Sequence, residues 1–218
     1  SGWNDVLKGP GLFTGLARLN GETIGIIADQ PTIISGAADA LGTEKFRFFV
    51  EFLNLRNIPL LMLSNAPGFY PGIKQEKLRI QQIGGESLDA NVKGQIPVVS
   101  VVLNQNYGGR QIHAFSRALR PGIVYLALEN SIMGVMGANA SFDLFLGKKY
   151  QNLLTTGQTG GATQLKENYF IEFNNKSSAK NDANNTGILN WLIKDVKDLR
   201  INIIKALEQA KEESGIFN

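Results

Sequence analysis

The hydrophobic residues of the first third of the chain change their spacing twice. Apolar residues dominate positions 13–19 and 23–29, and the Asn-Gly pair between these runs predicts two short strands joined by a tight hairpin. From residue 43 to residue 57 the apolar positions recur at i, i+3, i+4 and i+7, which predicts a helix with one buried face. Thr43 is the expected N-cap of this helix. The stretch 30–42, with its glycines, predicts a loop before it.

Three continuous apolar runs follow, and helix-like stretches separate them. The runs predict buried strands of a parallel sheet, because strands covered on both faces lose the alternation of polar and apolar residues. They lie at 58–64, 96–103 and 123–129, and the intervening helices are expected at 74–92 and 110–119. A loop rich in proline and glycine, 65–72, follows the first of these strands. Such loops stand at the carboxyl end of a parallel sheet, where α/β proteins bind their ligands.

The last third of the chain contains two contrasting segments. Residues 151–186 are rich in Gln, Asn, Thr, Gly and Ser, which predicts a polar loop excursion. Beyond them, apolar residues with helical spacing predict an amphipathic C-terminal helix with a stripe of Val196, Leu199, Ile203, Leu207 and Ala210. We find no internal repeat and interpret residues 1–218 as one domain of the α/β class.

The composition narrows the classes of partner and chemistry. The chain has 22 basic and 19 acidic residues, and their scattered distribution argues against nucleic acid as a partner. It has neither a long apolar run nor a secretory signal pattern, so we expect a cytoplasmic protein without a membrane span. The absence of cysteine excludes disulfides and thiolate chemistry. A single histidine excludes a histidine-rich metal centre, and no metal site is expected.

The segment after the second buried strand carries the most suggestive chemistry. Tyr107-Gly108-Gly109-Arg110 stands between that strand and an expected helix, and the only histidine, His113, follows it. Glycines let a ligand approach the backbone closely, and the N–H groups that open a helix attract negative charge. From these residues alone, the turn is a tight connection, an anion site, or an oxyanion hole with His113 as its base.

Five segments resemble one known family, and they occur in the family's order. They read GLARLNGETIGIIADQP, IPLLMLSNAPGFYPG, IPVVSVVLNQNYGGRQ, IMGVMGA and GILNWLI…LRINIIKALE, and they span nearly the whole chain apart from 151–186. The chain thus resembles the C-terminal, carboxybiotin-binding domain of the carboxyltransferases of biotin-dependent acyl-CoA carboxylases, of the acetyl- and propionyl-CoA carboxylase type. The resemblance implies a crotonase-like α/β fold, in which ββα units stack as a superhelix.

The same resemblance implies partners. Full carboxyltransferases join this domain to an acyl-CoA-binding half, and their active site lies between protomers, so an oligomer is expected. The chain resembles the C-terminal half only, so it is a separate subunit, a piece of a larger protein, or a member that acts alone. It has neither the Met-Lys-Met biotin-attachment motif nor a G-x-x-x-x-G-K-[ST] loop. We therefore expect biotin on a separate carrier protein or domain, and ATP-dependent carboxylation on a biotin carboxylase.

The resemblance also assigns roles to the glycine turn. It implies that the N–H groups of Gly109 and Arg110 face the ureido carbonyl of biotin, within a biotin-binding turn that includes Tyr107 and Gly108. Arg110 departs from the small residue that is usual in the family. Its backbone N–H does not depend on its side chain, and the guanidinium either holds a carboxylate or phosphate or points to solvent.

Three further residues take their expected roles from the resemblance. Gly68 and Phe69 resemble the opposite wall of the site, and the alternative is a simple turn around the preceding proline. Ile112 falls where the family tunes its acyl pocket, which implies a short acyl chain, and the alternative is ordinary core. His113 is interpreted as a structural histidine, because the family is thought to pass the proton of the acyl α-carbon to biotin rather than to a side chain.

Three functions follow as hypotheses. In the first, the chain is a carboxyltransferase domain or subunit that moves a carboxyl group from carboxybiotin to the α-carbon of acetyl-CoA or propionyl-CoA, using a backbone oxyanion hole. In the second, it is a subunit of a malonyl-thioester or malonate decarboxylase that uses the same hole. In the third, it is a non-catalytic scaffold domain of the crotonase fold that binds no ligand.

Overall fold

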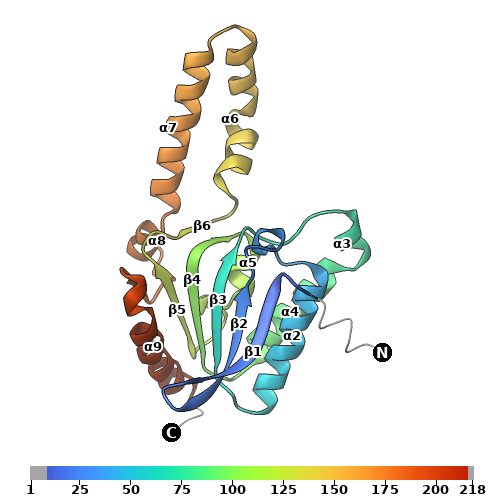
Figure 1. Ribbon diagram of the computed structural model, residues 1–218, viewed down its shortest axis with the longest axis vertical. Helices are drawn as coiled ribbons and strands as arrows, with labels where there is room; N and C mark the ends of the chain where they lie inside the picture. The colour runs from blue at the N-terminus through green and yellow to red at the C-terminus, as the bar shows by residue number, and fades with distance from the viewer. Residues whose placement is uncertain (1–8, 216–218) are drawn as a thin grey trace.

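The computed structural model describes residues 9–215 and is built around a seven-stranded sheet (Figure 1). Its strands are β1 (Leu12–Leu19), β2 (Glu22–Asp29), β3 (Leu60–Ala66), β4 (Val98–Tyr107), β5 (Ile123–Leu128), β6 (Ile132–Gly134) and β7 (Trp191–Ile193). They are ordered β1-β2-β3-β4-β5-β7, and β6 pairs with the carboxyl end of β4. β1 is antiparallel to β2, and the other described pairs are parallel.

The predicted hairpin and the predicted buried strands are confirmed. Asn20 and Gly21 join β1 to β2 with φ angles of 49° and 84°, and positive angles at both positions are what a type I′ hairpin turn requires. The three apolar runs form β3, β4 and β5, and β3 and β4 extend further toward their carboxyl ends than expected. This extension carries both strands up to the two glycine-containing loops.

Helices cover both faces of the sheet. They are α2 (Ala40–Leu55), α3 (Ile73–Lys77), α4 (Ile80–Lys93), α5 (Gly109–His113), α6 (Ala138–Thr155), α7 (Thr159–Ser177), α8 (Ala179–Asn185) and α9 (Leu199–Ser214). In Figure 1, α2 and α4 lie on one side of the sheet and α9 on the other. Leu60 and Met62 of β3 pack into the cluster of Phe46, whereas Leu61 packs into the cluster of Ile203. Alternate residues of the central strands thus bury themselves under opposite helix layers, as the α/β class requires.

The first long helix begins earlier than the apolar spacing predicts. It starts at Ala40, and the carboxylate of Asp39 caps it by accepting a hydrogen bond from the N–H of Gly42 at 2.8 Å. Thr43, the expected N-cap, lies inside the first turn, where its hydroxyl donates to the carbonyl of Asp39 at 2.7 Å. The prediction was wrong because it followed the apolar stripe, whereas the helix starts at the nearest side chain that satisfies its free N–H groups.

Two predicted helices are interrupted. The stretch 74–92 is two helices, α3 and α4, because Arg79 between them has left-handed angles of 60° and 40°. The stretch 110–119 is a single turn, α5, followed by a short 3-10 turn at 117–119. Between them Phe115 takes a φ of 63° and is fully buried beside Phe46, with 5.6 Å between the ring centroids. Burial of this ring ends the helix that the local pattern predicted.

The predicted loop excursion at 151–186 is wrong, because most of this segment is helical. α6 and α7 form a hairpin that projects from the body, and α8 leads back to it (Figure 1). The hairpin is held by one aromatic seam, in which Phe142 packs against Tyr150, Tyr169 and Phe170. Two antiparallel helices need only a narrow apolar seam, so the remaining polar residues gave the segment the composition of a loop.

The C-terminal amphipathic helix is confirmed with one exception. Ile203, Leu207 and Ala210 of α9 are buried against the sheet. Val196 precedes the helix in a 3-10 turn and is 63% exposed, so it does not belong to the buried stripe. Within residues 9–215, we find no helix that is both long enough and apolar enough to cross a membrane.

Candidate active site

The carboxyl ends of β3 and β4 bring the two glycine-containing loops together. Ala66, the last residue of β3, pairs with Asn106 of β4. Gly68 then follows one strand and Gly108 the other, with φ angles of 131° and 61°. Gly108 combines this φ with a ψ of −146°, a region that is essentially open to glycine alone. The prediction that these loops share the ligand-binding edge of the sheet agrees with this arrangement.

The turn after β4 presents backbone donors. Gly108 uses its own N–H, which donates to the carbonyl of Gly134 at 2.9 Å. Gly109 and Arg110 open α5, so their N–H groups have no acceptor within the helix. α5 has five residues, so the macrodipole of a long helix, which the sequence suggested, does not contribute here. The available positive charge is that of the local N–H groups.

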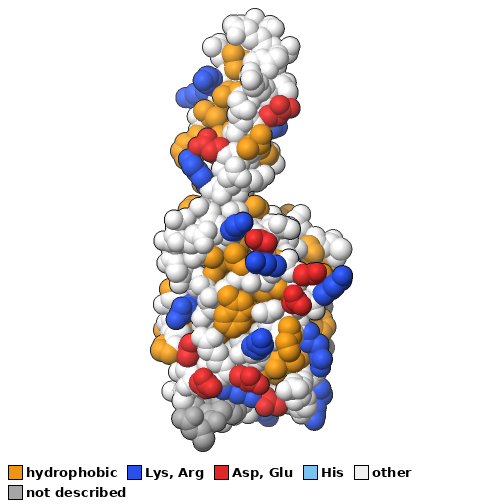
Figure 2. Space-filling view, turned by 90° about the vertical axis from the view of Figure 1, so that its left-hand side faces the viewer, with side chains coloured by type: hydrophobic (Ala, Val, Ile, Leu, Met, Phe, Trp, Pro, Cys, Tyr) orange, Lys and Arg blue, Asp and Glu red, His pale blue; other side chains and the backbone are white. Residues whose placement is uncertain are grey.

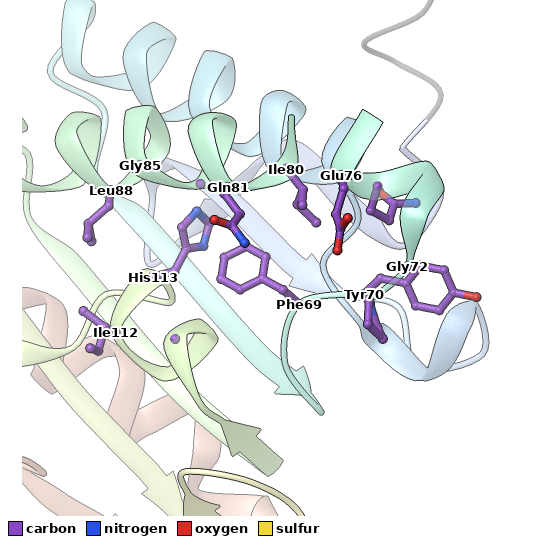
Figure 3. Close-up of a pocket in the computed structure, with 14 residues that line it drawn as sticks. Phe69, Tyr70, Gly72, Glu76, Ile80, Gln81, Gly85, Leu88, Ile112 and His113 are labelled. Carbon is purple, nitrogen blue, oxygen red and sulfur yellow. The ribbon is translucent and has the colours of Figure 1, made fainter. Parts of the chain in front are cut away.

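The loop after β3 is held in place by a strand-like bridge. The N–H of Ala38 donates to the carbonyl of Gly68 at 3.0 Å, and the N–H of Tyr70 donates to the carbonyl of Ala38 at 2.9 Å. Phe69 lies between these two contacts and projects its ring toward α4 and α5 (Figure 3). The loop is therefore fixed to the segment before α2 as well as to β3.

A cavity of about 530 Å³ opens beside Gly109, between the β3–α3 loop, α4 and α5. Its size is within the usual range of small-molecule sites. Figure 3 shows Ile80 and Leu88 of α4 facing it from one side, and Phe69 and Ile112 from the other. Small residues of α4 complete the wall, since a Cβ atom on Gly84 would lie 3.8 Å from the ring of Phe69. The walls are mainly apolar.

The predicted site residues divide into two groups. Phe69, Gly109, Ile112 and His113 line this one cavity. Ile112 is 49% exposed at its rim, so the alternative that it is ordinary core is wrong. The remaining predicted residues, Tyr107, Gly108, Gly68 and Arg110, are not among those that line it. Burial raises the pKa of Tyr107, and its ring packs beside Gly137 rather than into the cavity.

Arg110 is buried, with only 1% of its surface exposed, so the alternative that it points to solvent is wrong. Its Nη2 atom forms an ion pair with Oδ1 of Asp29 at 2.6 Å, and its Nη1 atom lies 2.5 Å from Nδ1 of His113. The guanidinium does hold a carboxylate, and that carboxylate comes from β2 of the same chain. A free anion therefore does not have this side chain as its ligand.

His113 is held as a neutral ring. Its Nε2 atom lies 2.7 Å from the hydroxyl of Ser87 in α4, and its ring packs against Phe46 and Phe69 at centroid distances of 4.3 and 5.5 Å. Arginine can only donate, so Nδ1 accepts from Arg110 and the proton is on Nε2. Burial, followed by the charge of Arg110, holds the pKa of His113 well below its ordinary value. The lone pair that a general base needs is occupied, which supports the structural role.

Two residues that support the site were missed by sequence reasoning. Ser87 accepts a hydrogen bond from the ring of His113, and Gln75 accepts one from the N–H of Ala40 at the start of α2, at 2.8 Å. Both are buried polar side chains on α3 and α4. The available signal was the small-residue face of the predicted helix, with Gly84 and Gly85 one turn before Leu88, which is typical of close approach by another element.

The α/β sheet, with two glycine-containing loops converging on one pocket, defines an α/β protein with a ligand-binding site at the carboxyl edge of its sheet. Comparison with known proteins gives the family. Residues 6–214 match the model of the carboxyl transferase domain, so the chain belongs to that family. Its fold is the crotonase type, as the sequence predicts.

Two curated relatives place this match in context. The chain is 36% identical over 152 residues to the methylmalonyl-CoA carboxyltransferase 12S subunit of Propionibacterium freudenreichii subsp. shermanii, covering 67% of this chain and 29% of that protein. It is 31% identical over 168 residues to the methylmalonyl-CoA decarboxylase subunit alpha of Propionigenium modestum, covering 77% of this chain and 32% of that protein. The aligned part thus amounts to about a third of either relative's length.

A solved structure supports the same family. A transcarboxylase 12S structure, described as a hexamer assembly with methylmalonyl-coenzyme A and methylmalonic acid bound, superposes with a TM-score of 0.80 and 30% identity. The superposition covers 93% of this chain and 38% of that chain.

Proposed function

We propose that the chain is the carboxybiotin-binding domain of a biotin-dependent acyl-CoA carboxyltransferase, which transfers a carboxyl group to the α-carbon of a short acyl-CoA. The observation that carries the proposal is the meeting of two loops at the ends of β3 and β4. The backbone N–H of Gly109 lies at the wall of a mainly apolar cavity, and that of Arg110 is the next donor in the same turn. Membership of the carboxyl transferase family supports it. The chain matches about a third of its relatives, so the complete activity also requires parts that this chain does not supply.

The residues of the cavity fit a flat, uncharged ring system that carries one strongly polar oxygen. Phe69 and Ile112 offer apolar surface, and Gly109 has no side chain that would separate its backbone from a ligand. Carboxybiotin supplies an activated carboxyl group, the loss of which leaves negative charge on the ureido oxygen. The N–H groups of Gly109 and Arg110 donate to that oxygen in this proposal, and each such donor contributes about 3–4 kcal/mol where charge develops.

The proposal assigns no proton transfer to His113. Both of its ring nitrogens already have partners, Arg110 at Nδ1 and Ser87 at Nε2. Ile112 borders the cavity and is 49% exposed, and a branched aliphatic side chain there restricts the space available to an acyl group. We infer that acetyl and propionyl groups are accepted in preference to longer ones.

The proposed partners are an acyl-CoA-binding half, a biotin carboxyl carrier protein and a biotin carboxylase, within an oligomer. The length of the relatives supports the acyl-CoA-binding half, and the hexamer described for the 12S protein supports the oligomer. The cytoplasmic location stays a prediction.

A decarboxylase is the second candidate, because one of the relatives is a methylmalonyl-CoA decarboxylase subunit. In that function the carboxyl group would pass from the acyl thioester to biotin, the reverse of the same step, so the same two N–H donors would face the ureido oxygen. The carboxyl group would afterwards leave biotin as carbon dioxide. The two candidates differ in the direction of carboxyl transfer and in the final fate of the carboxyl group. The architecture of this domain is compatible with both.

Reconstitution separates the two candidates. The chain is mixed with an acyl-CoA-binding half, carboxylated carrier protein and either acetyl-CoA or propionyl-CoA, and the formation of malonyl-CoA or methylmalonyl-CoA is measured. A carboxyltransferase gives these products only when all components are present. A second mixture contains methylmalonyl-CoA and uncarboxylated carrier protein. Carrier-dependent loss of the carboxyl group there, with no net carboxylation of either thioester in the first mixture, would instead favour the decarboxylase.

A further inference from the structure

A continuous chain of buried polar contacts runs beneath the cavity. The N–H of Asn65 donates to Oδ2 of Asp29 at 2.9 Å, and Oδ1 of Asp29 is paired with Arg110 at 2.6 Å. Arg110 donates to His113 at 2.5 Å, and His113 donates to Ser87 at 2.7 Å. These contacts link the end of β3, the end of β2, α5 and α4 in one series.

The two charged members of this series, Asp29 and Arg110, are buried, although a buried ion pair adds little to the stability of a protein. The side chains of Asp29 and Arg110 are each 1% exposed. Removing two charges from water costs about as much free energy as their attraction returns, so a buried ion pair contributes little net stability compared with apolar residues of similar size. Loss of one partner alone is costly, because the other charge is left buried and unpaired. A pair of this kind is better explained by the geometry that it imposes.

The pair joins the two loops of the candidate site. Asp29 binds the backbone of Asn65, three residues before Gly68, so its carboxylate holds the β3 side. Arg110 belongs to the donor turn itself, so the anchoring of its side chain restrains the position of its own backbone N–H. The guanidinium donates to Asp29 and His113 with separate nitrogens of one rigid plane, which a lysine ammonium on a flexible stem does not reproduce.

We propose that Asp29 and Arg110, with His113 and Ser87, are positioning residues that fix the distance between the Gly68–Phe69 loop and the backbone donors of Gly109 and Arg110. The relevance to carboxyl transfer rests on the function proposed above, whereas the coupling of the two loops does not. His113 extends the coupling to the cavity wall, because its ring packs against Phe69 and its Nε2 atom holds α4. None of these side chains touches the reacting atoms in this proposal.

A double-mutant cycle tests the role in turnover, in the reconstituted complex. Asp29→Asn and Arg110→Ala each leave one buried charge without its partner, and we expect each to lower kcat at least tenfold while KM changes less than threefold. The two side chains act through one contact, so we expect the double variant to have a kcat within threefold of the poorer single variant, rather than the product of the two losses. Single-variant effects that multiply in the double variant, or kcat values within twofold of wild type, would overturn the proposal.

Trp191→Phe serves as the control for a general loss of stability. Trp191 packs in the cluster of Ile203 and donates a hydrogen bond to Asn202 at 3.0 Å. This cluster lies on the opposite face of the sheet from Phe46, over which Arg110 and His113 pack. We expect this variant to lower Tm with kcat within twofold of wild type. Arg110→Lys keeps the charge without the planar fork, and we expect it to recover Tm more fully than kcat. Equal recovery of Tm and kcat would indicate a structural role only and would overturn the proposal.

A measurement on the isolated chain is independent of activity. In Asp29→Asn the amide resonance of Asn65 shifts in any case, because that N–H binds the altered side chain directly. If the pair couples the loops, the amide of Gly109 shifts as well, and in Arg110→Ala the amide of Phe69 shifts. Where a single variant does not fold, the double variant is compared with wild type at Phe69. Unshifted amides at these reporter positions overturn the inference, while shifted amides in a chain inactive in every mixture overturn only the proposed function.

Discussion

At the scale of single residues, the candidate site depends on backbone groups that glycine exposes. Gly108 adopts angles that other residues avoid, and a Cβ atom there would lie 3.2 Å from the carbonyl oxygen of Val135. Gly109 has ordinary helical geometry and needs no such freedom. The first glycine therefore shapes the turn, and the second leaves room beside its N–H group.

The N–H of Gly109 can be removed without breaking the turn. Gly109 is the first residue of α5, a position at which proline fits because its missing N–H has no helical partner. We expect Gly109→Pro to lower kcat by about 100-fold or more, the usual cost of one lost oxyanion donor. The matched control is Gly109→Ala, which keeps the N–H and places a methyl group 3.6 Å from the ring of Phe69. Steady-state rates in which alanine is as damaging as proline would contradict a role for this donor.

The buried histidine makes a pH-dependent contribution to stability. The folded state holds the pKa of His113 well below its ordinary value through burial and the charge of Arg110, whereas the unfolded chain binds a proton near pH 6.5. The unfolded state therefore binds more protons below about pH 6.5, and the free energy of unfolding falls as the pH decreases, by up to about 1.4 kcal/mol per pH unit. Urea unfolding at about pH 7.5 and about pH 5.5 measures this loss.

His113→Gln is the control for that titration, because glutamine retains a donor and an acceptor but does not ionise. His113 is the only histidine of the chain. The fall in the free energy of unfolding between the two pH values should therefore be about 1 kcal/mol smaller for this variant than for wild type. Parallel pH profiles for the two proteins would show that His113 takes up its proton as readily in the folded state as in the unfolded chain.

The sequence predicted the glycine turn but not what lies behind it. The Gly-Gly pair, its place after a buried strand and the structural role of His113 follow from local pattern and resemblance. The partner of Arg110 does not, because Asp29 lies 81 positions away and meets it only when β2 and β4 take their places in the sheet. Burial of a charged side chain is decided by such distant partners, which no local pattern reveals.

At the scale of elements, the order of strands and helices positions the site, and the projecting hairpin of α6 and α7 stands apart from it. Strands were predictable because continuous apolar runs have few alternative structures. The helical hairpin was not predictable from the sequence, because its helices are polar over most of their surface and meet through a single aromatic seam. Composition therefore identified the segment as unlike the rest of the chain without giving its structure.

The aromatic seam should hold the hairpin without affecting the sheet. Phe142 is 2% exposed and packs against three aromatic rings of α6 and α7. Phe142→Ala should cost about 3–5 kcal/mol of local stability, the usual cost of removing a buried phenylalanine. We expect rapid proteolysis within α6 and α7, detected by mass spectrometry, while the amide exchange of β3 and β4 stays protected.

Leu144→Ala is the matched control in the same helix, because Leu144 is 65% exposed and makes no comparable contribution to the seam. We expect its proteolysis pattern to be that of wild type. Loss of protection in β3 and β4 of the Phe142→Ala variant would show that the hairpin and the sheet unfold as one unit, contrary to this prediction.

At the scale of the whole molecule, the hairpin carries apolar side chains with no partner in the described chain. Phe145 and Leu144 of α6 are 69% and 65% exposed, and Ile171 of α7 is 62% exposed. Figure 2 shows apolar side chains along the hairpin, interspersed with charged ones, on the face of the molecule that it presents. A helical arm that extends beyond its own domain, with apolar residues on its outside, is typical of a segment that another domain covers.

If the chain has the function proposed above, we expect the acyl-CoA-binding half to cover this arm, because the curated relatives are about three times as long as the part that this chain matches. We expect the double variant Leu144→Lys/Phe145→Lys to weaken association with that half at least tenfold, or about 1.4 kcal/mol, as measured by sedimentation. Both side chains are exposed in the isolated chain, so its Tm should stay within about 2 °C of wild type. Val196→Lys introduces a charge at an equally exposed apolar position beside α9, away from the hairpin, and should leave association unchanged. If it weakens association as much as the hairpin variant does, added charge rather than lost hairpin contact is responsible, and the hairpin is not the interface.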